Sequence, residues 1–302
     1  MKLIKSTTKN INFVKDLESH DELIFSGDVG NLFEKLKSKK LFDLVVTSPP
    51  YNIGKEYESA KTLDEYFENQ KEVIKAIDKH VKDSGSICWQ VGNYINKKDG
   101  SIFPLDIGFY NIFNDLGYIL KNRIIWHFGH GLQATKRLSG RYETVLWFVK
   151  SEDYTFNLDP IRIPQKYPGK TYYKGPNKGK ISSNKLGKNP EDVWYIPNVK
   201  GNHIEKTEHP CQFPVGLIER LVLGMTNPGD IVFDPYMGVG SAGIAALAHG
   251  RKFIGAEIDG KYVKIARKRL KDFKKGDLNY RSHKKEIFDH RKLKIGRAEE
   301  YE

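Results

Sequence analysis

Short apolar runs alternate with amphipathic stretches along most of the chain. The runs read as β-strands because each is bounded by turn residues. Strands are predicted at residues 23–25, 42–46, 86–91, 120–126, 144–149, the start of 231–241 and 252–256, and helices at residues 31–37, 62–81, 104–116 and 242–249. Several strands are apolar throughout, which is typical of a parallel sheet covered on both faces, so the pattern predicts an α/β fold.

Three regions depart from this alternation. Residues 1–20 are polar and give no clear element, and Ser84-Gly85 is predicted to turn the chain into the strand at 86–91. Residues 268–302 are charged and are predicted to form a helical tail, for which a solvated helix is the default. Residues 151–208 contain six prolines, many glycines and lysines, and five aromatic residues from Tyr167 to Tyr195, so they are expected to form loops with little core of their own.

Charge adds a candidate partner. The 302 residues carry a formal net charge of +12. Residues 121–206 hold sixteen Lys and Arg against seven Asp and Glu, an excess of nine positive charges. Such clustering favours a polyanionic partner, and a phosphate backbone fits best beside interleaved aromatic residues. A basic protein from a lysine-rich proteome is the alternative.

Cysteine content bears on location. Cys88 and Cys211 are too few for a disulfide framework, and no signal peptide or long apolar segment is visible. We therefore expect a cytoplasmic protein without membrane contact, with Cys211 as a half-buried thiol. His127 and His130 lack a further ligand at suitable spacing, so no metal site is expected.

The segment Thr-Ser-Pro-Pro-Tyr-Asn at residues 47–52 directly follows an apolar strand. Two consecutive prolines fix φ and offer no N–H, so this loop is stiff and its carbonyls are free to accept hydrogen bonds. Ser48 adds an acceptor, and Tyr51 adds a flat ring that can stack on a base. These features suit an exocyclic amine as substrate, whereas a plain Pro-Pro turn is the structural alternative.

A second candidate site lies near the other end of the chain. Residues 231–241 lead from an apolar strand into a glycine-rich turn before a predicted helix, which is how nucleotide-type cofactors are held. Glu257 ends the next strand, nineteen positions beyond Gly238, at a distance suited to ribose hydroxyls. Gly238, Gly240 and Gly243 also satisfy a dinucleotide fingerprint, so the spacing alone leaves NAD open.

Three motifs together resemble one family. Residues 233–241, Phe-Asp-Pro-Tyr-Met-Gly-Val-Gly-Ser, resemble the S-adenosylmethionine-binding motif of DNA amino-methyltransferases. Residues 209–214 are similar to the segment before that motif, and residues 48–51 to the catalytic loop. The catalytic loop precedes the cofactor motif, which is the permuted order of the β class. The resemblance covers about residues 21–270.

The resemblance implies a Rossmann-like, circularly permuted sheet with late antiparallel strands, S-adenosylmethionine as cofactor, and double-stranded DNA as partner. It implies catalytic roles for Ser48, Pro49, Pro50 and Tyr51. It implies cofactor contacts for Asp28, Thr47, Phe213, Asp234, Pro235, Tyr236, Gly238, Gly240, Ser241 and Glu257. The expected organisation is a catalytic half at 1–150, a target-recognition region at 151–208, a cofactor half at 209–270 and a tail at 271–302. A homodimer and a cognate restriction endonuclease are left open as partners.

The chemistry expected from the resemblance is methylation of a flipped base. Ser48 Oγ and the Pro49 carbonyl accept the protons of the amine, whose lone pair attacks the methyl group without a covalent enzyme intermediate. Ser-Pro-Pro-Tyr mostly accompanies N4-cytosine enzymes, so cytosine is preferred and N6-adenine is the alternative. A nucleophilic Cys211 is disfavoured because the Pro-Pro-Tyr loop then lacks a purpose. A catalytically inactive DNA-binding protein on the same scaffold is the other alternative.

Overall fold

The computed structural model describes residues 1–8, 11–37, 40–51, 62–96, 98–129, 131 and 133–285. Asn52, the last residue of the catalytic segment, and His130 lie outside the described residues. Within the described ranges, no helix is long and apolar enough to span a bilayer.

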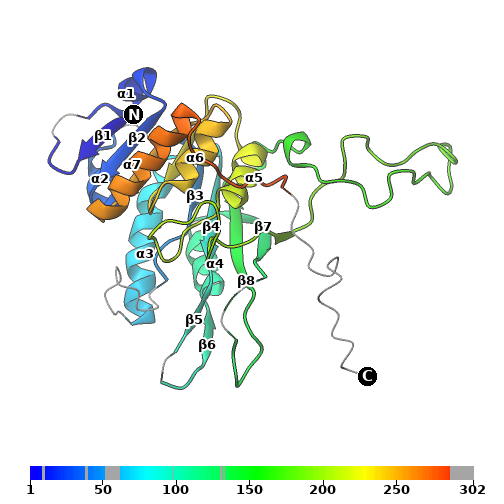
Figure 1. Ribbon diagram of the computed structural model, residues 1–302, viewed down its shortest axis with the longest axis horizontal. Helices are drawn as coiled ribbons and strands as arrows, with labels where there is room; N and C mark the ends of the chain where they lie inside the picture. Colours follow the sequence, from blue (N-terminus) through cyan, green and yellow to red (C-terminus); the bar gives the residue numbers. More distant parts are fainter. Residues whose placement is uncertain are drawn as a thin grey trace.

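One mixed sheet of nine strands runs through the described part of the molecule (Figure 1). Its order is β1-β2-β11-β10-β3-β4-β8-β7-β9, and β8 is antiparallel to both of its neighbours. The strands are β1 (Lys2–Lys5), β2 (Glu22–Ser26), β3 (Phe42–Thr47), β4 (Val81–Val91), β7 (Ile119–His127), β8 (Tyr142–Val149), β9 (Val193–Tyr195), β10 (Ile231–Asp234) and β11 (Lys252–Glu257). A separate hairpin joins β5 (Asn93–Ile95) to β6 (Ile102–Pro104).

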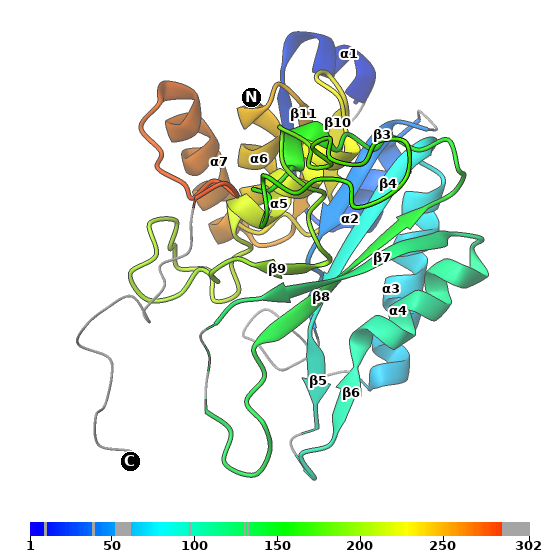
Figure 2. The ribbon, with the colours of Figure 1, turned by 90° about the vertical axis from the view of Figure 1, so that its right-hand side faces the viewer.

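Helices cover both faces of this sheet, as the apolar strands predicted. Figure 2 shows α3 and α4 on one side and α5, α6 and α7 on the other. One core cluster packs the first four helices against the sheet, and a second packs the last three. The helices are α1 (Phe13–Ser19), α2 (Val29–Lys35), α3 (Leu63–Asp78), α4 (Leu105–Asp115), α5 (Val215–Met225), α6 (Ser241–Ala248) and α7 (Gly260–Lys275), with the 3-10 turn η1 (Asp159–Ile161).

The position of β10 is what joins the two predicted motifs. Although β10 comes late in the chain, it lies in the sheet directly beside β3 and parallel to it, with Val232 opposite Leu44 and Phe233 opposite Val45. Parallel neighbours end at the same edge of a sheet, where open α/β folds bind ligands. The loop after β3 and the glycine turn after β10 therefore emerge side by side.

Two sequence predictions about elements were wrong, and one stretch without a prediction contains two elements. Ser84-Gly85 is not a turn before a strand, because β4 already begins at Val81 and these residues lie in a bulge opposite Asp43. The bulge needs a glycine, since a Cβ at residue 85 would lie 3.0 Å from the Asp43 carbonyl oxygen. No element was predicted for residues 1–20, but their described part contains β1 and α1, which are both too short to give a clear sequence pattern.

The second wrong prediction concerns the C-terminal tail. Of the helical tail predicted at 268–302, residues 286–302 lie outside the described residues. Within the described part the helix α7 continues to Lys275 and ends there, because Gly276 has φ +81°, a left-handed conformation that terminates helices. Residues 277–285 are not helical. The Arg281 N–H donates to Glu205, and the Ser282 hydroxyl and His283 N–H donate to Glu219 of α5, so this stretch packs on the sheet's helical layer rather than standing in solvent.

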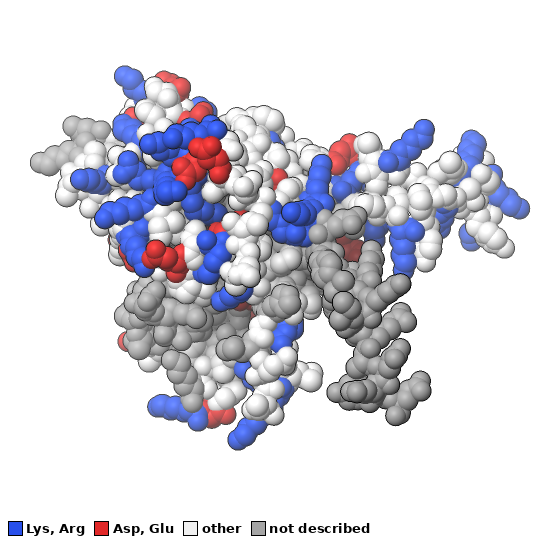
Figure 3. All heavy atoms as spheres, in the orientation of Figure 1, with Lys and Arg blue, Asp and Glu red and all other residues white. Residues whose placement is uncertain are grey.

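Residues 151–208 form mostly loops, as predicted. Residues 162–188, here called the arm, extend away from the sheet (Figure 1) and carry seven lysines. Two isolated bridges hold the arm together, Ile163 with Lys188 and Thr171 with Ile181. Figure 3 shows basic side chains along the arm. Tyr173, in the loop closed by the Thr171–Ile181 bridge, is 89% exposed. The arm thus presents cations and an aromatic ring to solvent.

Candidate active site

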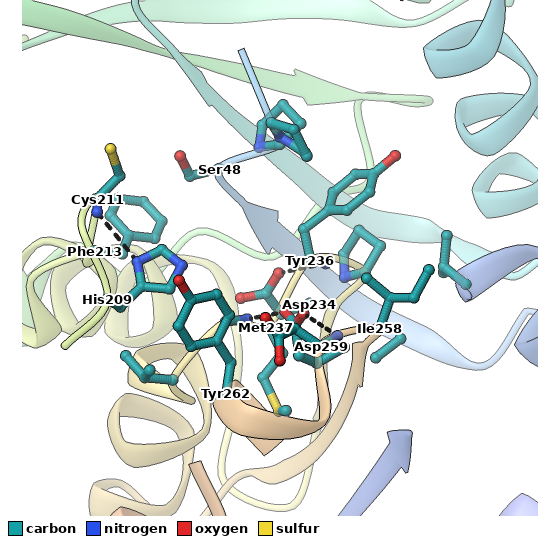
Figure 4. Close-up of a pocket in the computed structure, with 18 of the residues that line it drawn as sticks. Ser48, His209, Cys211, Phe213, Asp234, Tyr236, Met237, Ile258, Asp259 and Tyr262 are labelled. Carbon is teal, nitrogen blue, oxygen red and sulfur yellow. Dashed lines mark hydrogen bonds between the residues drawn. The ribbon is translucent and has the colours of Figure 1, made fainter. Parts of the chain in front are cut away.

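A cleft opens at the carboxyl ends of β3, β10 and β11 (Figure 4). Most of the residues predicted for the site line it: Asp28, Ser48, Pro49, Pro50, Tyr51, Phe213, Asp234, Pro235, Tyr236, Gly238, Ser241 and Glu257. Two predicted residues do not, because Thr47 is fully buried behind the wall and Gly240 packs against Ala266 of α7. Figure 4 shows Ser48 across the cleft from Asp234 and Met237.

A buried hydrogen bond ties the two sides of the cleft together. Thr47 Oγ1 donates to Asp234 Oδ1 at 2.6 Å, and the Tyr236 N–H donates to the same oxygen at 3.1 Å. Burial nevertheless raises the pKa of Asp234 to about 7, because these two bonds offset only part of the lost solvation. The catalytic loop and the cofactor motif are thus coupled through a carboxyl group that titrates near neutrality.

Asp234→Asn is expected to remove a pH dependence of stability. In the unfolded chain the pKa of Asp234 is about 3.9, so this carboxyl ionises at lower pH in the unfolded chain than in the folded protein. The unfolding free energy is therefore highest below about pH 4 and falls as pH rises to about 7. Relative to the variant, the wild type should lose about 2.7 kcal/mol of unfolding free energy between pH 5 and pH 8, since two pH units of this window lie below the folded pKa. Urea unfolding at both pH values measures this, and parallel changes in the two proteins would contradict it. Both observed bonds reach Oδ1, which asparagine retains.

The glycine turn keeps side chains away from the cleft floor. Gly238 has φ +54° and Gly240 has φ +78°, both in the left-handed region, and Gly240 precedes the first turn of α6. Gly243 serves packing instead, because a Cβ there would lie 2.8 Å from the Phe253 ring. The turn therefore offers backbone N–H groups at a helix N-terminus to a ligand that lies close to the chain.

Glu257 is held rigidly beside this turn. Its Oε2 accepts the Gly238 N–H and its Oε1 accepts the Asp259 N–H, both at 2.8 Å. Burial raises the pKa of Glu257, and the neighbouring Asp259 adds to the effect. Each carboxylate oxygen has a further lone pair. Ile258 next to it is 70% exposed, an apolar wall that suits the face of a purine. Asp28 accepts the Gly30 N–H as the N-cap of α2, and it also lines the cleft.

The catalytic loop is held by two residues that the sequence did not single out. Tyr51 Oη lies 3.0 Å from Ser48 Oγ and donates to Gln90 Oε1 at 2.6 Å. Gln90 Nε2 donates in turn to Glu143 Oε2 at 2.5 Å, and the same carboxylate oxygen lies 3.3 Å from Tyr51 Oη. Burial raises the pKa of Glu143 and holds the pKa of Tyr51 well above its usual value. A carboxylate therefore stands behind the proline loop.

The opposite wall contains the His209–Pro214 segment. The His209 ring accepts the Cys211 N–H and packs on Tyr262 with centroids 4.4 Å apart, and burial lowers the pKa of His209 to about 4. His209 is therefore neutral at physiological pH and acts structurally. Cys211 is exposed at the cleft, so the prediction of a half-buried thiol was wrong. Phe213 lines the cleft and packs against the second core cluster.

The comparisons with known proteins agree with this geometry. The DNA methylase family, comprising N6 and N4 methyltransferases, matches residues 42–268. The type II methyltransferase M.BglII of Bacillus subtilis is 49% identical over 249 residues, which are 82% of this chain and 69% of that protein. The DNA adenine methyltransferase YhdJ of Escherichia coli (strain K12) is 33% identical, over 82% of each chain.

Solved structures share the fold. The PvuII DNA methyltransferase (cytosine-N4-specific) superimposes with a TM-score of 0.65 over 87% of this chain and 94% of its own, at 20% identity. The M1.HpyAVI–SAM complex gives a TM-score of 0.58 over 82% and 98%, at 23% identity. The predicted α/β methyltransferase sheet is thereby confirmed.

Proposed function

Because the chain belongs to the DNA methylase family of N6 and N4 amino-methyltransferases, we propose that it methylates the exocyclic N4 amine of a flipped cytosine in duplex DNA. The observation that carries this proposal is the shared cleft, in which Ser48 faces the glycine turn and Thr47 is bonded to Asp234. Type II relatives support a role in a restriction-modification system, and a cognate endonuclease as partner stays a prediction. A homodimer stays a prediction.

The cofactor is S-adenosylmethionine, which supplies a methyl group on a positively charged sulfur. The cleft fits it in three respects. Glu257 has lone pairs left for ribose hydroxyls, the exposed Ile258 and the Tyr236 ring supply apolar surface for adenine, and the side-chain-free turn at Gly238 accommodates the methionine portion. These features and the family membership disfavour the NAD alternative.

Catalysis in this proposal rests on Ser48 and Pro49. An exocyclic amine is conjugated with its ring and is a poor nucleophile. Acceptance of its two protons by Ser48 Oγ and the Pro49 carbonyl favours a pyramidal nitrogen whose lone pair points at the methyl group. No covalent intermediate forms, so the exposed Cys211 takes no part as a nucleophile. Stacking of the base on Tyr51 stays a prediction, because its hydroxyl is already fixed by Gln90.

DNA contacts are assigned to residues 151–208, with the arm as their main part. Lysines along the arm suit the phosphate backbone, and the exposed Tyr173 and Tyr167 can pack on sugars or bases. These contacts offset the few kcal/mol needed to flip a base out of the duplex. The target-recognition role predicted for this region is kept on that basis.

Cytosine is preferred as the target base because of one residue in the catalytic loop and one in the segment at 209–214. A serine precedes Pro49-Pro50, and Phe213 stands where adenine enzymes of the family often have lysine. N6-adenine is the second candidate, because YhdJ is named an adenine methyltransferase.

Nucleoside analysis tests the proposal. Unmethylated duplex DNA is incubated with the full chain and tritiated S-adenosylmethionine, digested, and analysed by mass spectrometry. We expect N4-methyldeoxycytidine. N6-methyldeoxyadenosine would overturn the base assignment, and the absence of any methylated nucleoside together with tight DNA binding would favour the inactive scaffold.

A further inference from the structure

A chain of hydrogen bonds runs from the catalytic Ser48 through Tyr51 and Gln90 to Glu143, and the mechanism above assigns no role to Gln90 or Glu143. It draws on the loop after β3, on β4 and on β8, so three neighbouring strands converge behind the catalytic serine. Any role assigned to this chain rests on the proposed function, because it acts on the same amine.

The direction of each hydrogen bond is fixed by Glu143. An ionised carboxylate can only accept, so the amide nitrogen of Gln90 must face it and the amide oxygen must face Tyr51. Tyr51 has one hydroxyl proton, and it points to Gln90 Oε1 or to Glu143 Oε2. Its contact with Ser48 can then only be one in which Tyr51 accepts and Ser48 donates.

The consequence falls on Ser48. Since its only proton is directed at Tyr51, its lone pairs are left as acceptors for the substrate amine, as the proposed chemistry requires. If the group at the position of Glu143 could donate a proton, every hydrogen bond between it and Ser48 could reverse its direction. Ser48 could then present its own proton to the amine nitrogen. That orientation competes for the lone pair that must attack.

Packing keeps Glu143 in place. A Cβ at Gly92 would lie 3.2 Å from Glu143 Oε1 and 3.3 Å from the Tyr51 ring, so this glycine gives both side chains their room. Within the described residues, Oε1 of Glu143 accepts no hydrogen bond, and both contacts converge on Oε2. The carboxylate is therefore dedicated to this chain.

We propose that Glu143 is a positioning residue for methyl transfer, which polarises the Glu143–Gln90–Tyr51–Ser48 chain so that Ser48 acts as an acceptor toward the amine. Protonated Glu143 would carry the donor that allows reversal. The methyl-transfer rate should therefore fall as pH drops through the pKa of Glu143, which burial raises above its usual value and the positive charge of Lys200 partly lowers again. Tyr51 stays protonated throughout, and the thiol of Cys211 lies near it.

Glu143→Gln tests this, because the amide keeps the shape of the carboxylate and adds a donor permanently. Single-turnover methyl transfer at pH 8 should be roughly 10- to 30-fold slower, with unchanged affinity for S-adenosylhomocysteine. Asp234, Glu257 and His209 also titrate in the cleft, so the ratio of wild-type to variant rates is the quantity to follow between pH 5 and pH 8. That ratio should shrink toward one as the wild-type Glu143 is protonated.

Two further variants sharpen the test. Glu143→Asp keeps an acceptor-only group and should recover part of the rate and the pH-dependent ratio, which a purely structural role would not produce. Glu72→Gln, the same change at an exposed carboxylate of α3, should match the wild type. A wild-type rate in Glu143→Gln, or a slower rate with a pH-independent ratio, would overturn the inference. Absence of methylation by the wild type would instead overturn the proposed function, and the inference with it.

Discussion

Ser48→Ala is expected to slow methyl transfer by roughly 10²- to 10³-fold, the range found when one preorganised hydrogen-bonding group is removed from an active site. Alanine deletes the side-chain acceptor for the amine, and the Pro49 carbonyl alone cannot favour the pyramidal nitrogen. Single-turnover incorporation of tritiated methyl groups into duplex DNA, with enzyme in excess, measures the chemical step directly.

The affinity for S-adenosylhomocysteine separates this effect from a damaged cleft. Ser48 stands across the cleft from the glycine turn, so calorimetric titration should give the same affinity for the variant and the wild type. Ser84→Ala, at an exposed serine in the β4 bulge, is the matched control and should leave the rate unchanged. Retained activity in Ser48→Ala would remove this residue from the catalytic role.

The local sequence was sufficient to predict the two loops that form the edges of the cleft. Consecutive prolines and the glycines at 238 and 240 restrict the backbone wherever they occur, so their loops could be predicted without knowing the fold. The apolar strands before them, β3 and β10, likewise predicted burial on both faces. That β3 and β10 are neighbours in the sheet was predicted only from the family resemblance. Local sequence cannot show it, because Asp43 and Ile231, whose N–H donates to the Asp43 carboxylate, are 188 positions apart.

The residues behind the catalytic loop could not be found in this way. Gln90 and Glu143 are 53 positions apart and meet only because β4 pairs with β8. In the sequence each is one polar residue in or beside an apolar strand, as many solvent-facing positions are. The signal that was available is that Gln90 interrupts a run of apolar residues in a central strand, where a polar side chain needs a buried partner.

Glu257→Gln is expected to weaken binding of S-adenosylhomocysteine by roughly 100-fold, or about 2.7 kcal/mol. Both carboxylate oxygens already accept backbone N–H groups, from Gly238 and Asp259. An amide in the same place must turn its own N–H₂ toward one of these donors, which displaces the turn. It also loses a lone pair for the ribose hydroxyls, and a site built to accept a hydroxyl loses much affinity when that acceptor is missing.

Isothermal titration at pH 8 measures this affinity, and Glu68→Gln, at an exposed position of α3, is the matched control. Circular dichroism should show a folded variant, because the sheet and both core clusters are untouched. Wild-type affinity in Glu257→Gln would mean that the ribose is held elsewhere, and Asp28, which follows the neighbouring strand β2 and lines the cleft, is the carboxylate to test next. Weaker binding in Glu257→Gln together with unchanged binding in Asp28→Asn would identify Glu257 as the ribose acceptor.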